Sequence, residues 1–201
     1  MDDKYMDALL NIKTGGFSEF APTFHYFRYE ATSYQVLNEL LEHFPFTKND
    51  RFVDFGCGKG RTLFFIHHFL KLPAVGIEMD AVLFRHLEAN YESYFHKHKG
   101  NREDVSLFHG FAEEYPIDRR ETIFYFFNPF SVQIFIQVVH NILDSYLENK
   151  RDIHLILYYP SRDYIYFLER QTPFRLVKEI PVTSLYEQND NERLLIYRLQ
   201  K

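Results

Sequence analysis

The sequence is poor in cysteine and in positive charge. Cys57 is the single cysteine among 201 residues, so no disulfide can form within the chain, and we expect a cytoplasmic protein. Lys and Arg number 23 against 28 Asp and Glu, giving a formal net charge of −5. Because phosphates are bound by basic surfaces, this balance argues against a nucleic-acid partner.

Long apolar segments and targeting signals are also lacking. The chain opens with acidic residues and shows no apolar segment of a signal peptide near its start. Its longest apolar runs, such as Ile123 to Phe127, have the length of a strand and are far shorter than a membrane span. We therefore expect no membrane association.

Several catalytic signatures are missing. The chain has no Gly-x-Ser-x-Gly turn of an acyl hydrolase, and its glycine-rich segment lacks the Gly-Lys-Ser/Thr of a P-loop. Among the ten histidines, neither the pair His67 and His68 nor the pair His96 and His98 has the spacing of a zinc signature. We expect no metal site.

What is present is a strand pattern that runs into a glycine-rich loop. Asp54 ends the apolar stretch, and three glycines follow at alternate positions: Gly56, Gly58 and Gly60. Glycine permits positive φ and lets a ligand lie against the backbone. A helix pattern begins at Arg61, and a helix N-terminus offers unpaired N–H groups to a polar ligand. We therefore expect residues 53–60 to hold a nucleotide-like cofactor.

The glycine spacing distinguishes between cofactors. A dinucleotide fingerprint requires G-x-G-x-x-G, but here the third glycine position is occupied by Arg61 and the extra glycine lies one residue earlier. The observed pattern is D-x-G-x-G-x-G, with Asp54 two residues before the first glycine. This pattern disfavours NAD. Cys57 lies inside the loop, where we expect a small filler that contacts the cofactor and not a nucleophile.

Strand and helix patterns alternate along the rest of the chain. Strands are predicted at 52–55, 74–77, 105–108, 122–127, 153–159, 174–182 and 193–199, and helices at 32–44, 60–70, 80–97, 131–148 and 162–171. Strands that are apolar on both faces predict an α/β fold with a mostly parallel, doubly wound sheet. A polar turn at 188–191 predicts a terminal hairpin that adds an antiparallel strand. We divide the chain into an N-terminal helical extension (1–31) and one domain (32–201).

Ligands of such sheets bind at the carboxyl ends of the strands. Glu78 ends the second predicted strand, and its carboxylate could accept hydrogen bonds from both hydroxyls of a ribose. The alternative role, helix capping, is more easily filled by Asp80. Tyrosines at the strand ends and in the N-terminal region could line the substrate side, although for any one of them a place in the core is the safer expectation: Tyr26, Tyr29, Tyr34, Tyr158 and Tyr159.

Three motifs together resemble class I S-adenosylmethionine-dependent methyltransferases: residues 54–60, residues 76–78 and residues 128–130. The resemblance spans about 32–130, is greatest to small uncharacterised bacterial members, and extends distantly to the cofactor domains of Dot1-type histone lysine methyltransferases. It implies S-adenosylmethionine as cofactor and a seven-stranded sheet in the order 3-2-1-4-5-7-6. The last seventy residues match in strand pattern only.

The resemblance also implies roles for individual residues. The glycine loop would cradle the methionine end of the cofactor, with Asp54 near its ammonium group and Glu78 on the ribose. Family members commonly have Asp at the position of Phe111, where it bonds the adenine amino group. Phe111 could instead stack on the adenine while the Ala112 N–H meets the ring edge, or it could belong to the core.

Asn128, Pro129 and Phe130 resemble the Asn-Pro-Pro-aromatic signature of methyltransferases that act on amide or exocyclic amine nitrogens. One proline is missing, so the motif does not select a nitrogen acceptor, and Asn128 or Ser131 could simply cap the helix at 131. We expect Asn128 at the active site as a substrate-positioning residue and cofactor contact, with Tyr34 as a second candidate.

These observations predict methyl transfer by in-line displacement to an unidentified acceptor, either a small molecule or a protein. The segment 14–34 would close over the site as a lid that hinges at Gly15 and Gly16. A non-catalytic S-adenosylmethionine-binding regulatory or scaffold protein remains an alternative, as does, less favoured, an NAD-dependent oxidoreductase.

Overall fold

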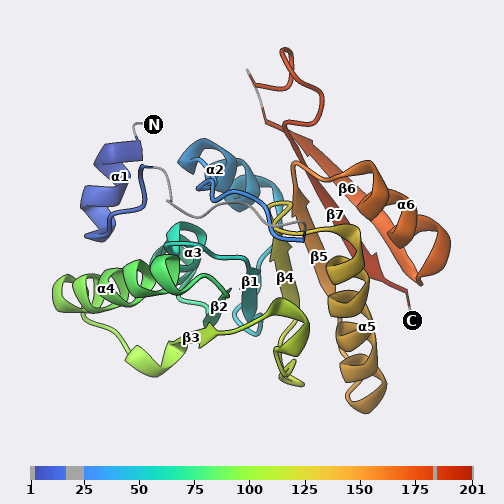
Figure 1. Ribbon diagram of the computed structural model, residues 1–201, viewed down its shortest axis with the longest axis horizontal. Coiled ribbons are helices and arrows are strands. Elements are labelled where there is room, and N and C mark those ends of the chain that lie inside the picture. The colour runs from blue at the N-terminus through green and yellow to red at the C-terminus, as the bar shows by residue number, and fades with distance from the viewer. Residues whose placement is uncertain (1–2, 17–24, 183–184, 201) are drawn as a thin grey trace.

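The computed structural model describes residues 3–16, 25–182 and 185–200, and its centre is one seven-stranded sheet (Figure 1). The strand order is β3-β2-β1-β4-β5-β7-β6, which confirms the predicted order. The strands are β1 (Phe52–Phe55), β2 (Ala74–Glu78), β3 (Val105–His109), β4 (Ile123–Phe126), β5 (His154–Tyr158), β6 (Phe174–Pro181) and β7 (Arg193–Leu199). The first five strands are parallel, and β7 pairs antiparallel with both β5 and β6. The predicted hairpin therefore places β7 inside the sheet and β6 at its edge.

The helices are α1 (Asp3–Leu10), α2 (Tyr34–His43), α3 (Arg61–Leu70), α4 (Ala81–Lys97), α5 (Val132–Glu148) and α6 (Arg162–Gln171). Two short 3₁₀ turns, η1 (Arg102–Asp104) and η2 (Ala112–Glu114), flank β3. In the part of the chain that the structure describes, none of these helices combines the length and the apolar character that a membrane crossing requires.

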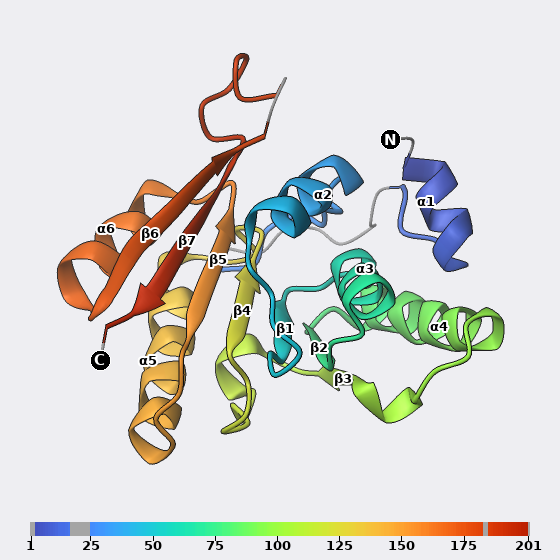
Figure 2. The same cartoon turned by 180° about the vertical axis from the view of Figure 1, so that it is seen from behind.

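Two apolar cores lie on opposite faces of the sheet (Figures 1 and 2). One core joins the sheet to α2, α3 and α4 and includes Phe52, Leu63 and Leu87. The other joins it to α5 and α6 and includes Phe55 and Phe135. Both faces of β1 and β4 are thus buried, which accounts for their uninterrupted apolar sequences.

The helix starts follow local capping chemistry. Ser33 accepts the N–H of Val36 at the start of α2, and Asp80 accepts the N–H groups of Val82 and Leu83 at the start of α4. Asp80 thus fills the capping role and leaves Glu78 available for another.

The N-terminal extension is packed against the domain through a buried arginine. The Arg61 guanidinium donates to Thr14 Oγ1 at 2.7 Å, to Asp3 Oδ2 at 2.5 Å and to the Thr32 carbonyl at 3.2 Å. A buried charge is stable only when it is paired and hydrogen-bonded. Arg61, which breaks the dinucleotide pattern, therefore anchors α1 to the start of α3.

Candidate cofactor and acceptor site

A cavity of about 310 Å³ lies at the carboxyl ends of β1, β2, β4 and β5. Its size falls at the lower end of the range of small-molecule sites. One wall is formed by Ile77, Glu78 and Met79 after β2, and another by residues 127–130 after β4. Residues 26–30 of the N-terminal segment close the third side. The site lies where the strand order reverses between β1 and β4, as ligand sites of doubly wound sheets do.

The glycine loop requires glycine at its first two positions. Gly56 has φ +73° and Gly58 has φ +56°, in the left-handed region that side chains disfavour. A Cβ at Gly56 would lie 2.5 Å from the Cβ of Pro129, and one at Gly58 would lie 2.1 Å from the ring of Tyr29. The loop is therefore closely covered by residues from two distant parts of the chain. Gly60, also at positive φ, is the N-cap residue of α3 and packs against Leu87.

Glu78 holds the glycine loop in place. Its Oε2 accepts the backbone N–H of Gly58 at 2.9 Å, and its Oε1 accepts the N–H of Asp80 at 2.8 Å. Burial raises the pKa of this carboxyl to about 7, although the two N–H groups oppose the shift. Each oxygen retains a second lone pair, so Glu78 can hold the loop and still accept a hydroxyl from the cavity.

Asp54 lies beside the main cavity. It borders a smaller void next to Gly56 that is also lined by Thr32, Arg61 and Tyr125. Burial, together with the nearby charge of Glu78, raises the pKa of Asp54 to about 8. A cationic ligand group in this void would stabilise the ionised form.

Cys57 is buried within the loop, and a Cβ at Gly76 would lie 2.8 Å from its sulfur. Burial raises the pKa of the thiol well above its usual value. The structure thus agrees with a filler role for Cys57.

Asn128 lines the cavity, and its side chain carries a buried, unpaired polar atom. Its Oδ1 is buried without a hydrogen-bond partner among the described residues, and its backbone has φ +41°. Ser131, not Asn128, occupies the N-cap position of α5. Unpaired buried oxygens and strained backbones are costly and are concentrated at functional sites.

Residues 25–27 form a strap that is paired with the segment after β4. The His25 carbonyl accepts the N–H of Ser131 at 2.7 Å, and Phe27 N–H donates to the Pro129 carbonyl at 3.1 Å. The Tyr26 hydroxyl donates to Glu113 of η2 at 2.7 Å. The strap therefore spans the cavity between the ends of β4 and β3. Of the predicted lid, 14–34, residues 17–24 lie outside the described residues.

Of the two residues predicted to contact the adenine, one lines the cavity. Ala112 is buried and lines the cavity. Phe111 is 44% exposed, so it does not belong to the core, and its ring lies 6.0 Å from that of Tyr26. Stacking of Phe111 on an adenine remains a prediction.

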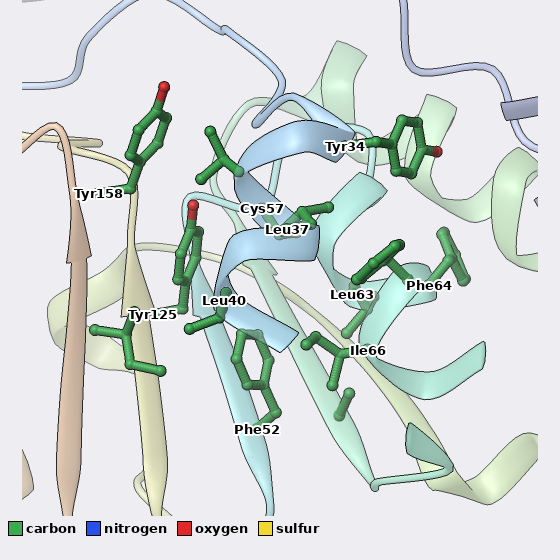
Figure 3. Close-up of a cluster of buried hydrophobic side chains, with 14 of the residues drawn as sticks. Tyr34, Leu37, Leu40, Phe52, Cys57, Leu63, Phe64, Ile66, Tyr125 and Tyr158 are labelled. Atoms are coloured by element: carbon green, nitrogen blue, oxygen red, sulfur yellow. The ribbon is translucent and has the colours of Figure 1, made fainter. Parts of the chain in front are cut away.

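The structure does not bring Tyr34 into the site, which corrects its candidacy as a substrate-side residue. Tyr34 is fully buried at the start of α2, where its hydroxyl donates to Asp7 at 2.7 Å. Its ring lies under the Arg61 guanidinium at 4.7 Å. Figure 3 shows the ring projecting from α2 on the side away from Tyr125 and Tyr158. Tyr34 therefore helps to stabilise the buried charge of Arg61.

Tyr159, one of the tyrosines predicted for the substrate side, lines the cavity. Tyr159 follows β5 with φ +50°, and its hydroxyl accepts the Nδ2–H of Asn189 at 2.9 Å. Its partner Asn189 lies 30 residues away in the β6–β7 connection.

No protein-family model and no curated protein matches this sequence. Solved structures do match. An RNA methyltransferase from Salinibacter ruber, in complex with S-adenosyl-L-homocysteine, is 19% identical with a TM-score of 0.56, covering 85% of this chain and 92% of that one. A SAM-dependent methyltransferase from Thiobacillus denitrificans, also with S-adenosyl-L-homocysteine, is 13% identical with a TM-score of 0.55, covering 85% and 92%.

The [4+2]-cyclase SpnF is 13% identical with a TM-score of 0.60, covering 89% of this chain and 87% of that one. The chain therefore has the fold of class I S-adenosylmethionine-dependent methyltransferases. That fold also accommodates other chemistry, so activity must be argued from the site.

Proposed function

We propose that this protein is an S-adenosylmethionine-dependent methyltransferase that acts on an acceptor not yet identified. The observation that carries the proposal is the paired arrangement of Glu78 and the glycine loop at the mouth of a cavity of ligand size. The fold supports it, since neighbours of the same architecture are solved with S-adenosyl-L-methionine or S-adenosyl-L-homocysteine.

The residues present fit this cofactor. Glu78 would accept the ribose hydroxyls, the loop 56–58 would lie under the methionine end, and Asp54 would face its ammonium group. The cofactor supplies an activated methyl on a sulfonium centre, so the protein's tasks are positioning and exclusion of water. The strap at 25–27 and the Asn128 side chain enclose the side from which an acceptor would approach. We propose residues 1–31 as the extension that covers the site.

Ligand binding tests the cofactor assignment. S-adenosyl-L-homocysteine should raise the melting temperature, because a ligand that binds only the native state stabilises it by mass action, while NAD should not. The shift should disappear in Asp54→Ala and Glu78→Ala and persist in Glu88→Ala, a change at an exposed position of α4. Stabilisation by NAD alone would contradict the assignment.

Catalysis is tested separately, by transfer of a labelled methyl group from S-adenosylmethionine to panels of small molecules and proteins. Binding of the cofactor without transfer to any acceptor would favour the regulatory or scaffold alternative.

A further inference from the structure

The main cavity and the void beside Asp54 share a wall. Glu78 lines the main cavity, which has a volume of about 310 Å³. Asp54 instead borders the smaller void, which has a volume of about 20 Å³. Tyr29 and Glu30 line both spaces, so the segment that carries them forms part of the wall between the two.

The smaller void is too small for the group that the proposed function places beside Asp54. A volume of about 20 Å³ holds about one water molecule. The methionine end of the cofactor carries an ammonium group and a carboxylate on the same carbon, and these atoms together need several times that space. An ammonium group can therefore reach Asp54 only after the wall has moved.

Tyr29 occupies one face of the glycine loop. Two of its ring carbons lie 2.1 and 2.4 Å from the position that a Cβ on Gly58 would take. Glycine at positive φ lets another group lie directly against the backbone, and here that group is a tyrosine of the same chain. The Lys59 ammonium group lies 5.0 Å from the centroid of the same ring. Tyr29 thus fills space that a ligand on the loop would need.

Thr14, which follows α1, holds Tyr29 in this place. The Tyr29 hydroxyl donates to the Thr14 carbonyl at 2.8 Å. Thr14 is itself fixed by its side chain, because Oγ1 accepts the Nε–H of Arg61 at 2.7 Å and donates to Asp7 of α1 at 2.8 Å. Thr14 therefore links the position of Tyr29 to the docking of α1.

The segment around Tyr29 has space beside it. A third cavity, of about 450 Å³, also borders residues 28–31. Arg28 and Glu30 are exposed, and none of residues 28–31 belongs to either apolar core. Displacement of this segment therefore leaves the packing of both cores intact.

We infer that residues 28–31 form a gate that is shut over the methionine end of the cofactor site, with Thr14 as its latch. This inference rests on the proposed function. The cofactor displaces Tyr29 before its ammonium group reaches Asp54, and the free energy of opening the gate lowers the apparent affinity. Because Thr14 is bound to α1, release of α1 from the domain favours the open gate.

Two ligands that differ only at the methionine end test the gate. Methylthioadenosine keeps the adenine, the ribose and the sulfur of S-adenosylhomocysteine but lacks the carbons that carry the ammonium group and the carboxylate. Its binding does not require the gate to open. Isothermal titration calorimetry gives the affinity of each ligand, and the ratio of the two affinities reports the gate alone.

Tyr29→Phe keeps the ring and removes the hydrogen bond to Thr14. It should bind S-adenosylhomocysteine about fivefold more tightly than the wild type, the equivalent of one net hydrogen bond, and methylthioadenosine equally well. Thr14→Val, which cannot bond to Arg61 or Asp7 through its side chain, should shift the ratio in the same direction. Tyr5→Phe, at an exposed position of α1, is the matched control and should leave the ratio unchanged.

The outcomes separate the gate from the function on which it rests. An affinity ratio that is the same in the wild type and in Tyr29→Phe, or weaker binding of S-adenosylhomocysteine by Tyr29→Phe, would overturn the gate. If neither the wild type nor any of these variants binds S-adenosylhomocysteine, the proposed function fails instead.

Discussion

Glu78 at the end of β2 accepts the backbone N–H of Gly58 at 2.9 Å, so the acid and the glycine loop form one structural unit. The same carboxylate accepts the N–H of Asp80, the residue that caps α4. A change at Glu78 is therefore expected to alter the loop as well as the ligand contact.

Glu78→Gln should lower the affinity for S-adenosylhomocysteine about tenfold or more. An amide provides one acceptor oxygen in place of two, so either the N–H of Gly58 or that of Asp80 loses its partner. Isothermal titration calorimetry measures the affinity, and hydrogen exchange at Gly58 and Asp80 reports the loop. Glu88→Gln, at an exposed site of α4, is the matched control. An unchanged affinity in Glu78→Gln would show that Glu78 does not contact the ligand.

Protein without ligand should lose stability as the pH rises from about 6.5 to 8. The pKa of Asp54 is about 8 and that of Glu78 about 7 in the folded protein, above the ordinary values of 3.8 and 4.5. Glu121, also buried, has a pKa of about 7, whereas burial lowers the pKa of His67, His68 and His154, which has the opposite effect at lower pH. Above about pH 6.5 the carboxyls dominate, so the folded state binds more protons than the unfolded state and the free energy of unfolding falls with rising pH, by on the order of 1 kcal/mol. Urea denaturation at several pH values measures it.

The pH slope should be shallower in Asp54→Asn, which cannot ionise, and unchanged in Asp163→Asn, at an exposed position of α6. A wild-type stability that stays flat or rises between pH 6.5 and 8 would contradict the burial of these two carboxyls.

Binding of S-adenosylhomocysteine near pH 7 should release protons. Its ammonium group would favour the ionised form of Asp54, whose raised pKa keeps it largely protonated without a ligand. Calorimetric enthalpies measured in buffers of different ionisation enthalpy give the number of protons released. The release should be reduced in Asp54→Asn, and a net uptake of protons would argue against this placement of the ammonium group.

Arg61→Lys should loosen α1 without unfolding the domain. A lysine cannot reproduce the separate hydrogen bonds to Thr14, Asp3 and the Thr32 carbonyl. Hydrogen exchange across residues 3–14 should accelerate several-fold more than exchange in β4. Arg102→Lys changes an exposed ion pair with Glu92 and should leave both regions unaltered. Equal protection of α1 in the two variants would refute Arg61 as its anchor.

The fold was predictable because its signals are local. Alternating apolar runs identified the strands and helices, and the glycine loop with Glu78 placed the site at the carboxyl edge of the sheet.

The parts of the site that the sequence did not predict depend on contacts between residues far apart in the chain, which no local pattern encodes. The strap is joined to the segment after β4 by a bridge between Tyr26 and Phe130, and Tyr159 is joined to Asn189 of another loop. Arg61 was visible only as a departure from the dinucleotide pattern. The buried Arg61 charge needs partners, and Tyr34 packs against its guanidinium and donates to Asp7, so Tyr34 does not line the cavity.

A crystal structure of the protein with S-adenosylhomocysteine tests the central claim most directly. We predict the ribose hydroxyls within hydrogen-bond distance of Glu78, the ammonium group facing Asp54, and the sulfur directed toward Asn128 and Tyr159. A ligand bound outside this cavity, or a cavity that stays empty at saturating ligand concentration, would contradict the account.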